Sequence, residues 1–309
     1  GQQAHIFLVN GNGIVFQQGA QVNVHSLTAS TVNIADRFIL DRLVGEANVA
    51  QFEGAVGGGA ANVNARIVVE EGARLTAGSQ GRVMLIAPTV ENRGQIEAAD
   101  GQVVLAAGTR AFLRAAGAED PNVRGLLIEV DNAGAVAEVP ATADTPATPA
   151  IPASPGRVLN LGTLSAPRGN VTMVGHAVNQ SGIARATSSV VANGTVYLLA
   201  RDQTRFTGTE RVATRAGSVT LAAGSRTEVL PQTADRTTTA DGEGGRDQAR
   251  PGRILVQGQQ VLVEGGAALT APAGRIELAA LVDPSTPTGR VHGAAAAATA
   301  WVHVASGAR

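Results

Sequence analysis

The sequence predicts an all-β protein with the architecture of a β-solenoid, and three observations carry this prediction. Short units of a turn followed by a strand recur about every 20 to 25 residues. Within each unit, apolar and polar residues alternate with period two, as in a strand with one buried face. Glycine is frequent (38 residues), whereas only 3% of the 309 residues are aromatic. We therefore expect many turns around a narrow core of small apolar side chains.

The composition is that of a folded chain with a balanced surface charge. Hydrophobic residues make up 44% of the chain and charged residues 16%, which is enough apolar material for a substantial core. All 24 basic residues are Arg, and together with 25 acidic residues they leave a net charge of −1. This balance argues against a nucleic-acid partner or an anionic membrane surface. The chain has no Cys for disulfides or thiolate metal sites, and no apolar run approaches the ~20 residues of a membrane span.

The most frequent unit is Gly-x-Val-x-Leu or a close variant, in which the glycine marks a turn and the alternation marks a strand. It occurs at Gly81 to Leu85, Gly101 to Leu105, Gly169 to Met173, Gly194 to Leu198, Gly217 to Leu221, Gly252 to Val256 and Gly274 to Leu278. Where no other segment intervenes, neighbouring copies start 20, 22, 23 or 25 residues apart. This period is typical of one solenoid coil.

Two further units recur between copies of the first. A glycine and a small residue follow a strand at Gly19, Gly72, Gly108, Gly224 and Gly266. A third unit, Val90-Glu-Asn92-Arg-Gly94-Gln-Ile96, is echoed by Val178 to Ile183. Together they predict three strands per coil. A leucine-rich repeat has a similar period, but its Leu-x-x-Leu-x-Leu frame is absent, and no segment from residue 156 onward shows a helical period.

A single coil cannot bury its inward face, so the coils must stack with parallel strands about 4.8 Å apart. At about 22 residues per coil, we expect roughly ten to twelve coils and a rod of about 50 to 60 Å. Residues 140–155 and 283–290 are punctuated by Pro and Thr, and residues 231–251 are rich in Thr, Asp, Gly and Arg. Because proline cannot join a central ladder, these stretches are predicted to be surface loops of a single β-helix segment over residues 1–309.

The N-terminal region carries the most specific motif of the chain. Asn10-Gly11-Asn12-Gly13-Ile14 is followed by Leu27 to Thr31 and by Asp36 to Leu40. These residues resemble the secretion domain of the filamentous haemagglutinin family of two-partner secretion exoproteins, also described as the haemagglutination activity domain. The family signature is Asn-Pro-Asn-Gly-Ile, and glycine stands at its proline position here. Residues 1–120 resemble the secretion domain, and residues 121–309, with Gly125 to Asp131, look like further coils of the same family.

The resemblance implies a right-handed parallel β-helix that is exported by the general secretory pathway and then by an outer-membrane two-partner secretion transporter. It also implies a location outside a Gram-negative bacterium, secreted or at its cell surface. Asn and Gly tolerate positive φ, so Asn10 to Gly13 is expected to form a tight turn between strands at residues 6–9 and 14–16. The residues alone leave open whether this is a plain β-turn or a recognition site.

The sequence offers no catalytic, cofactor or metal site. The histidines have no spacing suited to metal ligation: His5, His25, His176, His292 and His303. The clustered acidic Ca²⁺ site of a polysaccharide lyase cannot be assembled, and the glycine-aspartate segment Asp241 to Asp247 occurs only once. Sequons at Asn170, Asn179 and Asn193 are candidate glycosylation sites, with chance or asparagine stacking in turns as the alternative.

Three functions are consistent with these features. The first is a structural and adhesive rod, an adhesin or haemagglutinin that contacts host or bacterial cell surfaces. The second is the carrier stalk of a contact-dependent toxin or haemolysin, and the third is a carbohydrate-active β-helix enzyme. Residues 304–309 match the start of the unit at Val69 to Arg74 but lack the strand that completes it. An uncapped last coil exposes strand edges, so we expect an internal fragment capable of end-to-end self-association.

Overall fold

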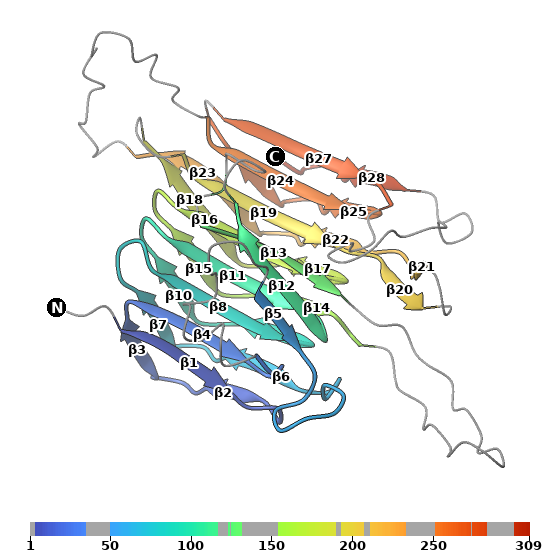
Figure 1. Cartoon of the computed structure of the whole chain (residues 1–309). Coiled ribbons are helices and arrows are strands. Elements are labelled where there is room, and N and C mark those ends of the chain that lie inside the picture. The colour runs from blue at the N-terminus through green and yellow to red at the C-terminus, as the bar shows by residue number, and fades with distance from the viewer. Residues whose placement is uncertain are drawn as a thin grey trace, which may run out of the picture.

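The computed structural model describes residues 4–34, 50–116, 123, 125–131, 154–189, 193–206, 211–232, 251–272, 274–282 and 300–309. Every regular element in this part of the chain is a β-strand, and three long parallel sheets wind around a common core (Figure 1). The protein is a right-handed parallel β-helix, as the sequence predicts. The described residues contain no helix long and apolar enough to cross a membrane.

Each coil contributes one strand to each of three sheets, which we call sheets A, B and C. Sheet A contains β1 (His5–Val9), β4 (Ser26–Ser30), β8 (Arg82–Ala87), β11 (Gln102–Ala107), β16 (Asn170–Gly175), β19 (Thr195–Ala200), β24 (Arg253–Gly258) and β27 (Arg275–Ala280). Sheet B contains β2 (Ile14–Phe16), β6 (Arg66–Val69), β9 (Thr89–Asn92), β14 (Arg157–Asn160), β17 (Ala177–Gln180), β22 (Ser218–Leu221), β25 (Gln260–Val263) and β28 (Trp301–Val304). Sheet C contains β3 (Gln21–Val24), β7 (Arg74–Ala77), β10 (Gln95–Ala98), β15 (Thr163–Ala166), β18 (Ile183–Ser188), β23 (Arg226–Pro231) and β26 (Ala268–Thr270).

The core lies inside the coils and is built from rows of apolar side chains in register. Val103 of β11 pairs with Val83 on one side and with Val171 on the other, and Val171 pairs with Val196. All four side chains are buried. Such rows remove apolar surface from water at every coil, so that each coil is stabilised by its two neighbours.

The repeat was predicted correctly in kind but not in number. Six copies of the Gly-x-Val-x-Leu unit lead into sheet A, whereas Gly217 to Leu221 forms β22 of sheet B. The unit specifies only a turn followed by a strand with one buried face, and strands of both sheet A and sheet B have these features. Sheet A has eight described strands, which corresponds to a stack of about 35 Å. The estimate of ten to twelve coils was too high because the chain also forms structure outside the coils.

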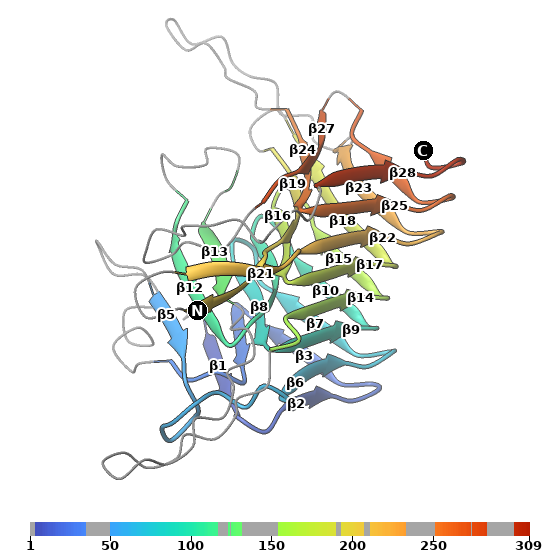
Figure 2. The same cartoon turned by 90° about the vertical axis from the view of Figure 1, so that its right-hand side faces the viewer.

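Along the chain, this additional structure is inserted after a strand of sheet A and before the next strand of sheet B. A three-stranded antiparallel sheet, sheet D, consists of β5 (Ala50–Glu53), β12 (Arg110–Ala115) and β13 (Leu126–Asp131). A second insertion is the hairpin of β20 (Gln203–Phe206) and β21 (Arg211–Arg215). Figure 2 shows that sheet D lies against sheet A on the side away from sheets B and C.

Sheet D covers a second apolar core on the outer face of sheet A. Met84 and Ile86 of β8 and Val104 of β11 point into this core, where they meet Phe52 of β5 and Leu113 of β12. All five side chains are at most 1% exposed. At β8 and β11 sheet A is therefore buried on both faces, which explains why residues 83–87 and 103–107 are continuous apolar runs.

The corner between sheets C and A is a stack of glycines, Gly81, Gly101 and Gly169. A Cβ on Gly101 would lie 1.8 Å from the carbonyl oxygen of Gly81, and one on Gly169 would lie 2.3 Å from that of Gly101. The residue before each glycine has a positive φ although it carries a side chain: Gln80 (63°), Asp100 (55°) and Arg168 (52°). An ion pair joins Arg168 to Asp100, with a distance of 2.5 Å between Nε and Oδ1, and so links the corners of successive coils.

The corner between sheets B and C has two forms. The wide form is a turn whose glycine has a positive φ, at Gly19, Gly72, Gly224, Gly266 and Gly307. This confirms the second sequence unit, except at Gly108, which follows β11 of sheet A and leads to sheet D. The narrow form contains a buried amide ladder, because Asn92 Nδ2 donates to Asn160 Oδ1 and Asn160 Nδ2 donates to Gln180 Oε1, both at 2.8 Å.

The predicted surface loops fall largely outside the described residues. Residues 140–153, 233–250 and 283–290 belong to the undescribed part of the chain, as do Asp36 to Leu40 of the family resemblance and Asp241 to Asp247. Residues 233–250 lie between β23 of sheet C and β24 of sheet A, whereas the stretch with residues 140–153 lies between β13 of sheet D and β14 of sheet B. The described coils continue in register on both sides of residues 140–153 and 233–250.

One buried histidine, His176, is expected to make the stability of the β-helix depend on pH. His176 lies at the corner after β16 and is 5% exposed, and its Nδ1 is 3.2 Å from the carbonyl oxygen of Arg201. Burial lowers the pKa of His176 below its ordinary value of 6.5, the contact with the Arg201 carbonyl opposes this shift, and the charge of Arg215 adds to it. Asp202 has a smaller opposing effect.

We expect this corner to lose stability in mild acid. The unfolded chain, with the higher pKa, takes up the proton first as the pH falls. The stabilisation from neutral His176 is therefore complete above about pH 6.5 and is lost as the pH falls toward the folded-state pKa. Urea unfolding at pH 7.5 and 5.5 should show a smaller loss of stability in His176→Gln than in the wild type. The control His303→Gln, on exposed β28, should lose as much stability between the two pH values as the wild type. An equal loss of stability in all three proteins would contradict this role of His176.

Candidate functional site

The motif Asn10 to Ile14 forms the first corner between sheets A and B. The amide of Gly13 donates to the carbonyl oxygen of Asn10 at 3.2 Å, and the amide of Asn12 donates to Asn10 Oδ1 at 3.0 Å. The amide of Asn10 is anchored to the carbonyl of Ser30 in the next coil. The expected tight turn is confirmed, with the difference that the strands it joins, β1 and β2, belong to different sheets.

A second turn of the same kind lies one coil further on, directly before β6. The amide of Ala65 donates to the carbonyl oxygen of Asn62 at 3.0 Å, and the amide of Asn64 donates to Asn62 Oδ1 at 3.1 Å. Asn62 Nδ2 also donates to the carbonyl oxygen of Gly11 at 3.3 Å, so the two turns are linked. Sequence reasoning missed this turn, although its Asn-x-Asn pattern before a strand matches that of Asn10 and Asn12.

The paired turns combine a constrained backbone with exposed side chains. Gly13 has a φ of 131°, and a Cβ there would lie 3.0 Å from the carbonyl oxygen of Arg66. Only glycine fits this position without strain. The side chains of Asn10 and Asn12 are exposed, and that of Asn12 forms no hydrogen bond with the residues that the structure describes. The fold therefore presents amide groups to solvent on a backbone held by the neighbouring coil.

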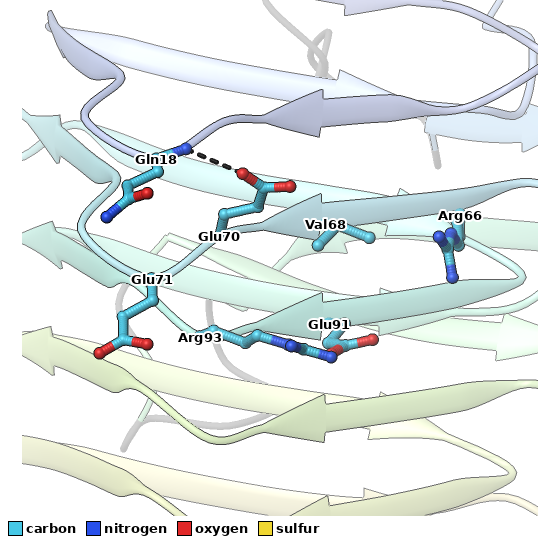
Figure 3. A pocket seen from close by; sticks show the side chains of 7 residues that line it. All are labelled: Gln18, Arg66, Val68, Glu70, Glu71, Glu91 and Arg93. Carbon is cyan, nitrogen blue, oxygen red and sulfur yellow. Dashed lines mark hydrogen bonds and ion pairs between the residues drawn. The ribbon is translucent and has the colours of Figure 1, made fainter.

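A shallow hollow of about 410 Å³ adjoins the second turn on the outer face of sheet B (Figure 3). Its lining comes from the first three coils and consists of Gln18, Arg66, Val68, Glu70, Glu71, Glu91 and Arg93. Glu70 Oε2 accepts the amide hydrogen of Gln18 at 2.9 Å, and Arg93 Nε pairs with Glu91 Oε1 at 2.5 Å. Arg66 and Glu71 lie at opposite ends of the hollow, and neither forms an ion pair with another described residue. This open surface of mixed charge suits contact with a polar polypeptide.

The comparisons with known proteins assign the chain to a family. A family model of the TPS secretion domain matches residues 1–209. The chain belongs to the TPS secretion domain family. A TPS secretion domain indicates a two-partner secretion exoprotein, secreted by a Gram-negative bacterium. The family that matches is thus defined by a secretion domain.

A solved structure shows the same fold as this TPS secretion domain. The crystal structure of the HMW1 secretion domain from Haemophilus influenzae matches with a TM-score of 0.52 at 21% sequence identity. The match covers 86% of this chain and 54% of the HMW1 chain, so this chain spans about half the length of that protein. No curated protein matches the chain.

The sequons differ in accessibility within the TPS secretion domain. Asn170 is 1% exposed and its Nδ2 donates to Thr195 Oγ1 at 2.6 Å, and Asn193 is 6% exposed. Asn179 lies on the outward face of β17 and is half-buried. Because a glycan needs an accessible Nδ2, Asn179 is the most accessible acceptor of the three in the folded chain.

Clusters suited to chemistry are few in the TPS secretion domain. Among the described residues, no group of three or more His, Cys, Asp or Glu side chains could hold a metal ion. The fold does bring His5 and His25 together, with ring centroids 5.1 Å apart. Their separation of 20 residues is one coil, and this coil period is the signal that could have found the pair from the sequence.

Proposed function

We propose that the linked turns at residues 10–14 and 62–65 are recognised by the periplasmic domains of the outer-membrane transporter. We further propose that the exported β-helix acts as a structural and adhesive rod at the cell surface. The observation that carries the proposal is the hydrogen bond from Asn62 Nδ2 to the carbonyl oxygen of Gly11, which joins two Asn-x-Asn turns with the same hydrogen-bond pattern. Two turns held at a fixed separation offer a partner more contact than one flexible turn, at a lower cost in conformational entropy.

The side chain of Asn12 separates recognition from folding. Asn10 Oδ1 accepts a backbone hydrogen bond within the turn, so its loss costs about 1 kcal/mol of stability. The exposed Asn12 side chain has no hydrogen-bond partner in the described part of the chain, so its removal leaves the hydrogen bonds of the turn intact. A secretion defect in Asn12→Ala therefore reports on recognition.

The test is secretion by cells that produce the chain, behind a secretory signal, together with its transporter. We expect Asn12→Ala to lower the amount of chain in the medium about tenfold, which corresponds to ~1.4 kcal/mol of lost recognition. The melting temperature of the purified variant should stay within about 2 °C of the wild type. Asn179→Ala, which removes an amide on β17 of sheet B four coils beyond the Asn12 turn, is the matched control and should be secreted normally. Normal secretion of Asn12→Ala would contradict the recognition role.

The adhesive part of the proposal has its own measurement. The outward face of sheet C is polar along its length and carries Asn23, Thr76, Glu97 and Ser165 in one row. Such a face favours contact with hydrated surfaces over burial in a further core. We expect the purified chain to be retained on host or bacterial cells. Retention no greater than that of an unrelated secreted β-helix would contradict adhesion and leave transporter recognition intact.

A further inference from the structure

The parallel pairing of the first two strands of sheet A places two histidines side by side at the first C-to-A corner. His5 begins β1, and its Cα partner in β4 is Ser26. His25 is the residue before Ser26, so the pairing brings His25 close to His5. The two imidazole centroids are 5.1 Å apart, and their planes make an angle of 69°. Both side chains are partly exposed. An incoming ion can therefore reach the pair.

The spacing of the rings matches that of two imidazoles that bind one metal ion. A Zn–N distance of about 2.0 to 2.1 Å puts each ring centroid roughly 3.2 Å from the metal, and a tetrahedral angle then separates the centroids by about 5.2 Å. We propose that His5 and His25 form a binding site for a borderline transition-metal ion, with Zn²⁺ as the representative. Imidazole nitrogen is a preferred ligand for such ions, whereas Mg²⁺ prefers oxygen ligands.

The surroundings leave room for the remaining ligands. His25 lines an open hollow of about 510 Å³ together with Asn23, Thr76 and Gly78. A Cβ on Gly78 would lie 3.2 Å from His25 Nδ1, so glycine at this position gives the ring its space. None of the described residues that line the hollow carries a carboxylate, so water molecules would complete the coordination. Two protein ligands give a weaker site than the three or four of catalytic and structural zinc centres.

Metal binding at this position would stabilise the first coil. Within the described residues, β1 is the terminal strand of sheet A and pairs only with β4. A metal ion shared by His5 and His25 would join the start of β1 to the residue before β4. Because the unfolded chain does not hold the two imidazoles together, the ion would shift the unfolding equilibrium toward the folded state.

The test is a Zn²⁺ titration of the intact chain, followed by calorimetry and by thermal unfolding. We expect one Zn²⁺ ion per chain and a rise in melting temperature of about 5 °C at a Zn²⁺ concentration near 100 times the dissociation constant. His5→Gln and His25→Gln should each weaken binding at least tenfold and lose this rise. His303→Gln, an exposed histidine on β28 of the last described coil, should behave as the wild type. Mg²⁺ at the same concentration should have no effect.

Two outcomes would overturn the site. Equal Zn²⁺ affinity in the wild type and both single variants would place the ion elsewhere on the chain. The absence of any Zn²⁺-dependent shift in the wild type would reduce the pair to an edge-to-face contact between rings. Melting temperatures of the variants without Zn²⁺, measured in parallel, show whether each substitution by itself affects the fold.

Discussion

Replacement of Val83 by Asp is expected to lower the free energy of unfolding by about 4 kcal/mol or more. Val83 is 1% exposed and points inward from β8, where Leu27 and Val103 are its neighbours in the row. The carboxylate would replace an apolar contact on both sides, and neither neighbour offers a hydrogen-bond donor in its side chain. An unpaired buried carboxylate either stays charged at a high cost in solvation or takes up a proton with a raised pKa.

The matched control is Gln95→Asp, which introduces the same side chain at an exposed, outward position of β10 in sheet C. A substitution there should change the stability by less than about 0.5 kcal/mol. Urea unfolding monitored by circular dichroism compares both variants with the wild type. If Val83→Asp unfolds at the same urea concentration as Gln95→Asp, then the inward face of β8 has been assigned incorrectly.

The sequence predicts the coil well because each coil repeats the same local rules. A glycine turn followed by large apolar residues at alternate positions, Val and then Leu or Met, appears at Gly81, Gly101 and Gly169, and all three lead into neighbouring strands of sheet A. The alternation identifies the inward face because successive side chains of a strand point to opposite sides. Stacking then follows, since a single coil cannot bury this face.

Sheet D lies beyond what periodicity can predict. Its central pairing joins Phe52 of β5 to Ala111 of β12, and these residues are separated by two intervening coils of the helix. No repeat length relates two strands from different insertions. The composition of sheet A does hold a signal, because residues 83–87 and 103–107 are apolar at every position. A strand with an exposed outer face would alternate, so these runs indicate a cover on that face.

Of the candidate functional residues, the sequence predicted only the turn at Asn10. The turn at Asn10 was found through its resemblance to a family motif, whereas the equivalent turn at Asn62 follows a loop that interrupts the coil period. The pair of His5 and His25 escaped notice because metal motifs are sought at helical or loop spacings. In a solenoid, residues one coil apart are neighbours, so the coil period is the spacing at which binding residues must be sought.

The glycine stack at the C-to-A corner leads to the second large effect, which is expected for Gly101→Ala. The new Cβ would lie 1.8 Å from the carbonyl oxygen of Gly81 and 2.9 Å from its carbonyl carbon. The backbone cannot move aside cheaply, because the Gly81 carbonyl accepts the amide of Gln102 at 3.1 Å and the Gly101 carbonyl accepts that of Asn170 at 3.0 Å. We expect a loss of about 4 kcal/mol or more, from the overlap or from the hydrogen bonds broken to relieve it.

Gly224→Ala provides the control that separates this overlap from backbone strain. Gly224 has a φ of +79°, but a Cβ there would meet no atom within 4 Å. Alanine at that position should therefore cost only about 1 to 2 kcal/mol, the penalty of a left-handed conformation. Urea unfolding of the two variants measures both losses under the same conditions. If Gly224→Ala loses as much stability as Gly101→Ala or more, then the corner between sheets C and A tolerates a methyl group. The glycines of that corner would then serve the turn and not the close approach of successive coils.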